Sequence, residues 1–382
     1  MVRQRGHGGN LAWAAAIAGC PQDLILDFSA SISPLGPPHS SLTAISSHMG
    51  YIKHYPDPNY TELRLALSQY HQLDPEWILP GNGSAELLTY VGREFAKFAA
   101  TALITPAFGD YYRALAAYDA KVLEFPFSLA RQNHAKEEGN REDMEKVSFT
   151  QPLSSLPLND FALSSRHGLL LNNPHNPTGK LWSRQAILPY LKKLPLVVVD
   201  EAFMDFLPPD QEQSLIGMVE KYPNLVILRS LTKFYSMAGL RLGYAIAHPD
   251  YLSRWDRWRD PWSVNSLAVA AAIAALKDKN FQRQTWEWLA PTREQLFRDL
   301  VSLPGLEPLP GSANFLLVRS QHSVIQLQER LLKEHHILIR NCKSFPELGD
   351  NYFRVAVLNE KNNQRLIKVL SLVLENQIIE IP

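Results

Sequence analysis

Cysteine is scarce in this chain of 382 residues, and so are long apolar runs and any excess of charge of one sign. Two cysteines, Cys20 and Cys342, are too few for a disulfide framework and cannot form a zinc site by themselves. No stretch reaches the roughly 18 uninterrupted apolar residues that a membrane-spanning helix needs. Lysine and arginine number 38, as do aspartate and glutamate, and the histidines lack metal-ligand spacing. We therefore expect a cytoplasmic globular protein with no metal and no nucleic-acid or membrane partner.

The N-terminus has some features of a secretion signal. Arg3 and Arg5 precede an apolar run over residues 11–19, and residues 17–20 resemble a lipoprotein cleavage site. However, a glycine-rich segment separates the two arginines from the apolar run. Asn10 is a good helix N-cap, and Gly19 is a good stop signal, so we expect a helix here.

From about residue 60 to residue 275, helical patterns alternate with short apolar runs. Such alternation predicts a mainly parallel sheet covered by helices on both faces. The expected helices cover residues 61–70 and 84–99. The expected strands cover residues 102–105, 122–125, 168–171, 196–199, 225–229 and 243–247. Residues 131–146 are charged and without period, which is typical of a surface loop.

Beyond residue 280 the pattern changes to that of a smaller α+β domain. Helices are expected over residues 292–303, 324–334 and 361–374, and strands over residues 314–318, 337–340 and 352–357. Residues 27–38 have extended character and are expected to pack on this part. We predict a large α/β domain over residues 46–279, and a small domain with an N-terminal arm from residues 1–45 and 280–382.

The strongest local signal is a lysine, Lys233, that follows an apolar strand and is flanked by hydroxyl side chains. Lysine is the side chain that forms a Schiff base with an aldehyde cofactor. Ser230 and Arg241 could hold a phosphate on such a cofactor, since arginine offers a fork of charged donors. The alternative is an ordinary surface lysine at the end of a strand.

Two further signals follow other predicted strands. Asp200 comes directly after the run Val197-Val198-Val199, at the strand end where α/β sheets place their ligands. There it could hold a protonated pyridine nitrogen, whereas an N-cap or metal-ligand role is the alternative. Asn176 lies in a turn over residues 172–179, and its amide can donate to a phenolate oxygen. A plain Pro/Gly turn is the alternative for this segment.

Weaker signals complete the set. Gly83 and Ser84 open a helix, where backbone N–H groups and a hydroxyl can face an anion. Phe108 could stack on a flat ring, although an aromatic residue after a strand usually belongs to the core.

In this order, these motifs resemble the fold-type I pyridoxal-phosphate enzymes of the class I/II aminotransferase superfamily over nearly the whole chain. The resemblance implies an α/β fold and pyridoxal 5′-phosphate as the cofactor. It implies that Lys233 carries the Schiff base, Asp200 partners the pyridine nitrogen, Asn176 contacts the ring O3′ and Phe108 stacks on the ring. It assigns the phosphate to Gly83, Ser84, Ser230 and Arg241.

The resemblance also implies a homodimer with shared active sites. Tyr55, within His54-Tyr55-Pro56-Asp57-Pro58, looks like the tyrosine that reaches the phosphate in the partner subunit. Three nearby tryptophans, Trp255, Trp258 and Trp262, are interpreted as core or dimer-interface packing rather than as a nucleic-acid surface.

Within the superfamily, the chain is most similar to threonine-phosphate decarboxylases of cobalamin biosynthesis and to histidinol-phosphate aminotransferases. The segments over residues 7–10, 27–36 and 230–235 are closer to the decarboxylase form. That similarity implies a small phosphorylated amino acid as the substrate. It assigns substrate binding to His7, Gly8, Ser31, Asn176, Arg340 and Arg354.

Three positions depart from the patterns of these relatives. Ser31 and Ser33 stand where the decarboxylase block usually has asparagine. Phe203 stands where aminotransferases commonly have a tyrosine that hydrogen-bonds O3′, which is mild evidence against an ordinary aminotransferase.

We therefore expect decarboxylation of L-threonine O-3-phosphate to (R)-1-amino-2-propanol O-2-phosphate. The alternatives are an aminotransferase of the histidinol-phosphate type that uses glutamate and 2-oxoglutarate, and a catalytically idle protein of the same fold.

Overall fold

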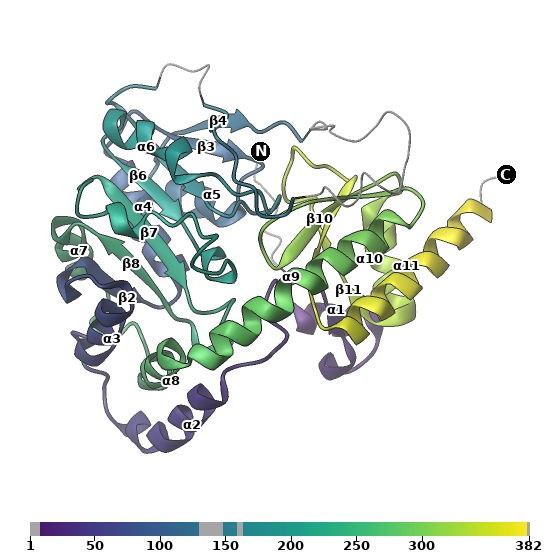
Figure 1. Ribbon diagram of the computed structural model, residues 1–382, viewed down its shortest axis with the longest axis horizontal. Coiled ribbons are helices and arrows are strands. Elements are labelled where there is room, and N and C mark those ends of the chain that lie inside the picture. The colour runs from purple at the N-terminus through teal and green to yellow at the C-terminus, as the bar shows by residue number, and fades with distance from the viewer. Residues whose placement is uncertain (1–7, 130–147, 159–162, 380–382) are drawn as a thin grey trace.

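The computed structural model of the chain describes residues 8–129, 148–158 and 163–379, the side chains of residues 376–379 excepted (Figure 1). The predicted loop over residues 131–146 and the predicted substrate residue His7 lie outside these ranges. A large sheet with its helices forms one part of the molecule, and a smaller sheet with α10 (Val324–His335) and α11 (Glu360–Ile379) forms the other.

The large sheet has seven strands in the order β2-β8-β7-β6-β5-β3-β4. Only β8 runs antiparallel to its neighbours, so the prediction of a mainly parallel sheet is confirmed. The strands are β2 (Ile78–Gly81), β3 (Ala100–Thr105), β4 (Val122–Pro126), β5 (His167–Asn172), β6 (Val197–Asp200), β7 (Leu225–Ser230) and β8 (Gly243–Ala247). The edge strand β2 was not predicted.

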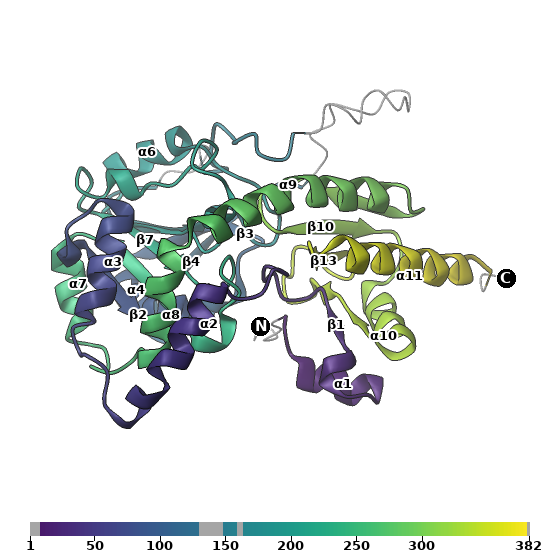
Figure 2. The ribbon, with the colours of Figure 1, turned by 60° about the horizontal axis from the view of Figure 1, so that its bottom comes forward.

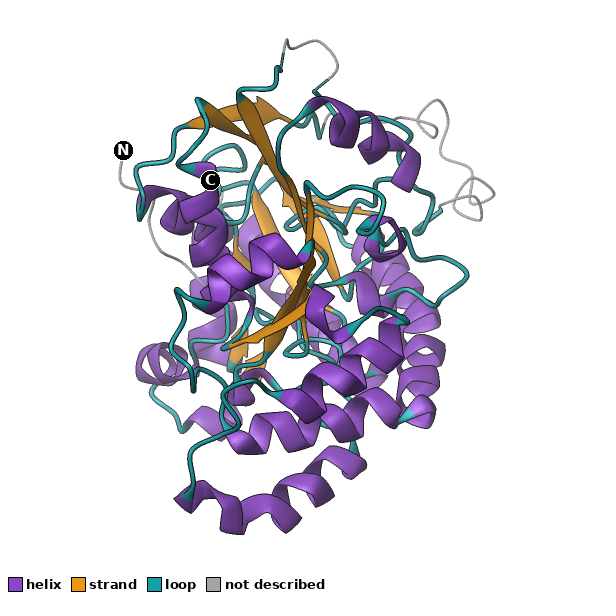
Figure 3. Cartoon of the chain, turned by 90° about the vertical axis from the view of Figure 1, so that its left-hand side faces the viewer, coloured by secondary structure: helices purple, strands orange, loops and turns teal. Residues whose placement is uncertain are grey.

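Helices cover both faces of this sheet (Figure 3). Successive side chains of a strand point to opposite faces, and Val197 and Val199 therefore pack in one apolar core whereas Val198 packs in the other. The helices are α2 (His39–His48), α3 (Thr61–His71), α4 (Ser84–Phe95), α5 (Gly109–Ala116), α6 (Arg184–Lys193), α7 (Pro249–Asp256) and α8 (Ser266–Lys277). The helix predicted over residues 84–99 ends early because the chain must turn before β3 begins at Ala100.

The smaller sheet has four antiparallel strands in the order β12-β13-β10-β9. Its strands are β9 (Leu306–Leu309), β10 (Phe315–Ser320), β12 (Arg340–Asn341) and β13 (Tyr352–Ala356). The prediction of one strand over residues 337–340 was wrong, because this segment divides into two strands. Residues 337–338 form β11 (Ile337–Leu338), which pairs with β1 (Leu26–Asp27), and Arg340 begins β12, which pairs with β13.

The long helix α9 (Lys279–Val301) passes from the large sheet to the smaller one (Figures 1 and 2). The helix predicted over residues 292–303 is only its second half, since the helix continues through Pro291. A second link is a close approach of two glycines: a Cβ on Gly179 would lie 2.9 Å from Cα of Gly311. The predicted domain limits at residues 45/46 and 279/280 stay a prediction.

The N-terminal helix α1 (Leu11–Ala18) is confirmed, with the Asn10 side chain accepting from the backbone N–H of Trp13 and with Gly19 in the left-handed conformation. It packs through Ala14 against the smaller part of the molecule. The expectation for residues 27–38 also holds at Phe28, whose backbone N–H donates to Leu338 and whose carbonyl accepts from Ala356. None of the helices in the described ranges is both long and apolar enough to span a bilayer.

Candidate active site

One pocket collects side chains from both sheets. It lies where β5, β6 and β7 end, and the last residue of each strand, Asn172, Asp200 and Ser230, contributes to its wall. The carboxyl edge of an α/β sheet is the expected position for a ligand. The pocket is lined by these predicted site residues: Gly8, Ser31, Ser84, Phe108, Asn176, Asp200, Ser230, Lys233, Arg241, Arg340 and Arg354.

Asp200 is buried at the end of β6 and has two hydrogen-bond donors. The Tyr111 hydroxyl donates to Oδ2 at 2.9 Å, and the backbone N–H of Ala202 donates to Oδ1 at 3.0 Å. Burial raises the pKa of Asp200 to about 6, against the lowering effect of these two donors. A cationic ring nitrogen placed here would favour the charged carboxylate, as an opposite charge does at short range.

Lys233 stands three residues beyond the end of β7. Burial lowers its pKa to about 8, and the guanidinium groups of Arg354 and Arg241 act in the same direction. The Lys233 carbonyl accepts from the backbone N–H of Ser33 at 3.1 Å, so the N-terminal segment contacts the loop that carries Lys233. A larger fraction of this amine is therefore neutral and nucleophilic at physiological pH than in an ordinary lysine.

The phosphate-binding residues of the prediction lie together. The hydroxyls of Ser230 and Thr232 are 2.7 Å apart, and Arg241 lines the same pocket. Ser84 opens α4, so its helix N-terminus presents free backbone N–H groups there. A Cβ on Gly83, which has a φ of +72°, would lie 2.5 Å from Nη2 of Arg241. Only glycine therefore leaves room for the arginine in this cradle.

The arginines predicted to bind substrate come from the smaller sheet. Arg354, on β13, donates through Nη1 to Oδ1 of Asn176 and through Nη2 to the carbonyl of Ser29 at 3.2 Å. Burial lowers the pKa of Arg354 to about 10. Arg340, on β12, donates to the Ser344 hydroxyl at 2.7 Å. Two cationic forks thus face the pocket that contains Lys233.

The N-terminal segment closes one side of the pocket. The Ser29 hydroxyl accepts from the backbone N–H of Gly9 at 2.8 Å and donates to Asp27 at 2.6 Å. A Cβ on Gly8 would lie 2.1 Å from the Ser29 carbonyl oxygen, so the chain comes very close at this point. Ser31 is buried in the pocket wall. The predicted position of this segment at the site is therefore observed for Gly8 and Ser31.

Phe203 lines the pocket and offers no hydroxyl there. Its ring packs edge-on against Phe315, with 5.1 Å between the ring centroids. Asn176 is therefore left as the predicted amide donor for O3′, with its own oxygen already held by Arg354.

Among the predicted site residues that the structure describes, Gly83 and Tyr55 do not line the pocket. Gly83 is in close contact with Arg241, which does line it. Tyr55 is 79% exposed, and its ring stacks on Trp262 at 4.4 Å. Trp262 is itself 44% exposed, whereas Trp255 is fully buried. Within its own chain, Tyr55 thus lies on the surface, and its role across a dimer stays a prediction.

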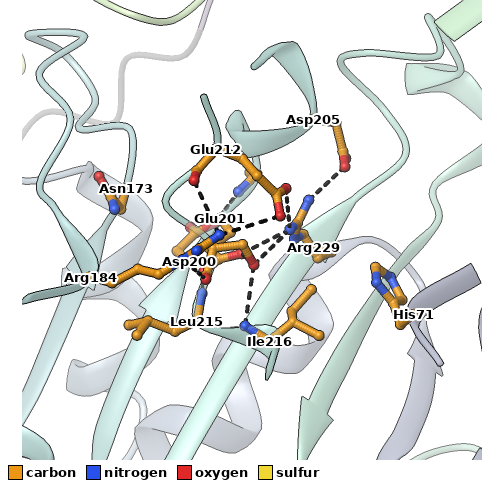
Figure 4. Close-up of polar contacts among 12 residues, drawn as sticks. His71, Asn173, Arg184, Asp200, Glu201, Asp205, Glu212, Leu215, Ile216 and Arg229 are labelled. Carbon is orange, nitrogen blue, oxygen red and sulfur yellow. Dashed lines mark hydrogen bonds and ion pairs between the residues drawn. The ribbon is translucent and has the colours of Figure 1, made fainter. Parts of the chain in front are cut away.

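An ionic cluster forms around Arg229 (Figure 4). Arg229 directly precedes Ser230 on β7, and Glu201 directly follows Asp200. Nη2 of Arg229 is 3.0 Å from the Glu201 carboxylate, and Nη1 is 2.5 Å from that of Asp205. Burial raises the pKa of both carboxyls, against the effect of Arg229. The cluster therefore joins the ends of β6 and β7, where the adjacent residues Asp200 and Ser230 line the pocket.

Tyr111, Thr232 and Ser29 also contribute to the site and were not predicted from the sequence. Tyr111 follows Phe108, the N-cap of α5, by three residues, but no pattern in the sequence indicated that its hydroxyl would meet Asp200. Ser29 and Thr232 stood within the motifs but carried no signal of their own. In the described ranges, no group of three His, Cys, Asp or Glu side chains is placed to hold a metal ion.

Comparison with known proteins decides the family. A sequence model of the family described as "Aminotransferase class I and II" matches residues 25–370. The chain belongs to this family. It is 38% identical over 373 residues to the threonine-phosphate decarboxylase of Salmonella typhimurium, with 96% of each chain covered. It is 36% identical over 307 residues to a histidinol-phosphate aminotransferase of Ralstonia nicotianae, with 77% of this chain and 74% of that protein covered.

The fold of the family is also that of solved structures. Histidinol-phosphate aminotransferase from Sinorhizobium meliloti, solved in complex with pyridoxal 5′-phosphate, superposes with a TM-score of 0.79 at 22% identity. That comparison covers 99% of this chain and 100% of the other. The predicted fold class is therefore confirmed.

Pyridoxal 5′-phosphate is the cofactor of this aminotransferase-family enzyme, as predicted. The residues of the pocket fit the cofactor both at its ring nitrogen and at its phosphate. A buried carboxyl with a raised pKa stands where a cation would neutralise it, and the glycine cradle at Gly83 leaves space for Arg241 to meet a phosphate.

Proposed function

We propose that this protein decarboxylates L-threonine O-3-phosphate to (R)-1-amino-2-propanol O-2-phosphate. The observation that carries the proposal is the convergence of Arg340 and Arg354 on the pocket of Lys233. A phosphorylated amino acid has two anionic groups, a phosphate and a carboxylate, and two guanidinium forks match them. Similarity to the Salmonella typhimurium threonine-phosphate decarboxylase over 96% of both chains supports this choice.

The residues around the cofactor would have the following roles. Lys233 holds the cofactor covalently, and Asp200 keeps a proton on the ring nitrogen. Ser84, Ser230 and Arg241 bind the cofactor phosphate. When bound, pyridoxal phosphate supplies the electron sink for the bond that breaks at Cα. Phe108 covers the ring and Asn176 donates to O3′.

The substrate groups would be held on the side of the smaller sheet. Arg340 and Arg354 would bind the substrate phosphate and carboxylate and so select which bond at Cα is broken. The bond from Cα to the carboxylate breaks, CO2 leaves, and Lys233 returns a proton to Cα. Because its pKa is lowered to about 8, Lys233 can take up and release that proton near neutral pH. Gly8 and Ser31 line the pocket and would contact the substrate. A substrate-binding role for His7, which lies outside the described residues, belongs to the same proposal.

The test uses purified protein loaded with the cofactor. L-threonine O-3-phosphate should release CO2 and leave an amino-propanol phosphate, whereas unphosphorylated L-threonine should react far more slowly. L-glutamate should leave the cofactor absorbance unchanged. If glutamate converts the cofactor to its amine form and phosphothreonine releases no CO2, the protein is an aminotransferase instead.

The aminotransferase alternative is supported by similarity to histidinol-phosphate aminotransferases, one of them 36% identical over 77% of this chain and another 30% identical over 94% of it. The threonine-phosphate decarboxylase combines a higher identity with a higher coverage, 38% over 96% of this chain. Phe203, which lacks the phenol hydroxyl, also favours the decarboxylase. A role in cobalamin biosynthesis within the cytoplasm follows from the proposed substrate and belongs to the same proposal.

We also propose that the protein is a homodimer in which Tyr55 reaches the cofactor phosphate of the partner subunit. Tyr55 and Trp262 form an exposed aromatic pair, and Met49, Tyr51 and Ile52 are exposed nearby in the sequence. A second copy of the chain would cover these apolar side chains.

Mixed dimers of Tyr55→Phe and Lys233→Ala chains test this arrangement. If Tyr55 reaches the site of the other subunit, each mixed dimer has one site with both an intact Lys233 and an intact Tyr55. That site should bind the cofactor with wild-type affinity. If Tyr55 has no role across the interface, mixing the chains adds no such sites.

A further inference from the structure

Asp200 is paired with a tyrosine that no sequence motif had indicated. Tyr111 lies on α5 and is 1% exposed, and its hydroxyl is 2.9 Å from Oδ2 of Asp200. Among the described residues, Tyr111 is the only one whose side chain donates a hydrogen bond to Asp200. The second donor is the backbone N–H of Ala202. The tyrosine thus controls one carboxylate oxygen of the group that faces the cofactor ring.

The same short helix carries both contacts to the cofactor region. Phe108 is the N-cap of α5 and lines the pocket, and Tyr111 follows it by three residues. The two rings meet edge-on, with 5.6 Å between centroids and an interplanar angle of 90°. A shift of α5 would therefore move two groups at once, the Phe108 ring and the Tyr111 hydroxyl that donates to Asp200.

We propose that Tyr111 is a positioning residue that holds the Asp200 carboxylate in its ionised form, aimed at the ring nitrogen of the cofactor. A hydrogen bond donated to a carboxylate favours the charged form. The hydroxyl can only donate in this contact, since burial and the neighbouring Asp200 charge raise the pKa of Tyr111 well above its usual range. The inference concerns the cofactor and holds for either of the two reactions considered above.

Two other charged groups act on Asp200. Asp110, on α5, raises the pKa of Asp200, whereas Lys233, on the loop after β7, lowers it. Burial raises that pKa more than any other cause, to about 6. The Tyr111 hydrogen bond is the first of the causes that lower it. Its loss should therefore raise the pH at which Asp200 becomes ionised.

The matched pair of variants is Tyr111→Phe and Tyr112→Phe. Both remove one hydroxyl from α5, but the Tyr112 hydroxyl donates to Glu124, at 2.6 Å, and Tyr112 does not line the pocket. The first measurement is the affinity of cofactor-free protein for pyridoxal phosphate against pH. Its acid-side midpoint should move up by about one pH unit in Tyr111→Phe, which corresponds to about tenfold in affinity on the acid side. It should not move in Tyr112→Phe.

The second measurement compares the cofactor with an analogue that has carbon in place of the ring nitrogen. Wild-type protein should prefer the natural cofactor, because an ionised Asp200 would face an uncharged C–H group in the analogue. That preference should fall by about tenfold in Tyr111→Phe, since the carboxyl then becomes neutral more easily. General loosening of the pocket would weaken both ligands alike and leave the preference unchanged, and that outcome would overturn the proposal.

Replacement of Tyr111 by 3-fluorotyrosine keeps the ring and the hydroxyl, so it separates the donor effect from a failure to fold. The fluorinated phenol is a stronger donor, and the acid-side midpoint should therefore move down, opposite to the effect of phenylalanine. A midpoint that stays in place, or moves in the same direction for both substitutions, would contradict the proposed role.

Discussion

Arg354 donates a hydrogen bond to Oδ1 of Asn176, although the two residues are 178 positions apart in the chain. The arginine belongs to the smaller sheet and the asparagine to the turn after β5. This bond fixes the orientation of the Asn176 amide, so its NH2 group is directed away from Arg354. The residue proposed to contact the cofactor and the residue proposed to bind substrate are thus joined directly.

Arg354→Lys should weaken substrate binding while the cofactor stays in place. Lysine keeps the charge but cannot donate to Asn176, to the Ser29 carbonyl and to the substrate at once. Loss of charge-assisted hydrogen bonds predicts an increase in KM for L-threonine O-3-phosphate of about 10- to 100-fold. Steady-state kinetics measures this, and the cofactor absorbance checks that the site is still loaded. Arg319→Lys, at a side chain that is 54% exposed on β10, is the control and should change neither quantity.

Lys233 should capture the cofactor more slowly as the pH falls. Only the neutral amine attacks an aldehyde, and the pKa of Lys233 is lowered to about 8, so the reactive fraction grows as the pH rises through that value. Stopped-flow absorbance on cofactor-free protein should show a capture rate that is half-maximal near pH 8. An ordinary lysine would give a midpoint near pH 10.4, and that result would contradict the effect of burial. Lys233→Ala should bind the cofactor without covalent attachment, whereas the exposed Lys279→Ala should behave as wild type.

Gly83→Ala should weaken binding of the cofactor phosphate. The added Cβ would lie 2.5 Å from Nη2 of Arg241, and the residue would have to keep a φ of +72°. With a ψ of 163°, this backbone conformation is adopted readily only by glycine, so a side chain there costs about 1–3 kcal/mol, and displacement of Arg241 adds the loss of a charged contact. We expect the dissociation constant for pyridoxal phosphate to rise about 10- to 100-fold. Gly239→Ala is the nearby control, since its Cβ would meet nothing within 4 Å; an equal loss there would exclude this explanation.

Arg229→Met should destabilise the protein strongly. Removal of the guanidinium leaves the buried carboxylates of Glu201 and Asp205 without their cation. Breaking a buried ion pair from one side costs about 3–5 kcal/mol in the free energy of unfolding. Arg283→Met removes an arginine that is 65% exposed and 3.8 Å from Glu287, and it should cost at most about 1 kcal/mol. Urea unfolding of both variants measures the difference, and equal losses would show that the cluster does not contribute more than a surface pair.

The strands and the site motifs could be predicted because their signals are local. An apolar run such as Leu225–Ser230 identifies its own strand, and Lys233 and Asp200 stand at fixed offsets from such runs. β2 was missed because its four residues include Pro80 and Gly81, which are unusual in strands. Such a segment becomes a strand only through its pairing with β8.

The remaining features depend on contacts between distant segments. Residues 337–340 divide into two strands because two different partners, β1 and β13, pair with them. The contact between Tyr111 and Asp200 joins residues 89 positions apart, and nothing in either local motif requires it. The position of Tyr55 relative to the phosphate depends on a second chain and is not determined by either the motif or the single chain.

The two sheets supply different chemistry to one pocket. Asp200, Lys233 and Ser230 come from the edge of the seven-stranded sheet, and Arg340 and Arg354 come from the four-stranded sheet. A redesign that aims at a new substrate can therefore alter β12, β13 and the segment between them while the cofactor attachments stay untouched. Because Arg354 donates to Asn176, a change of Arg354 would also require a compensating change near Asn176, on the side of the seven-stranded sheet.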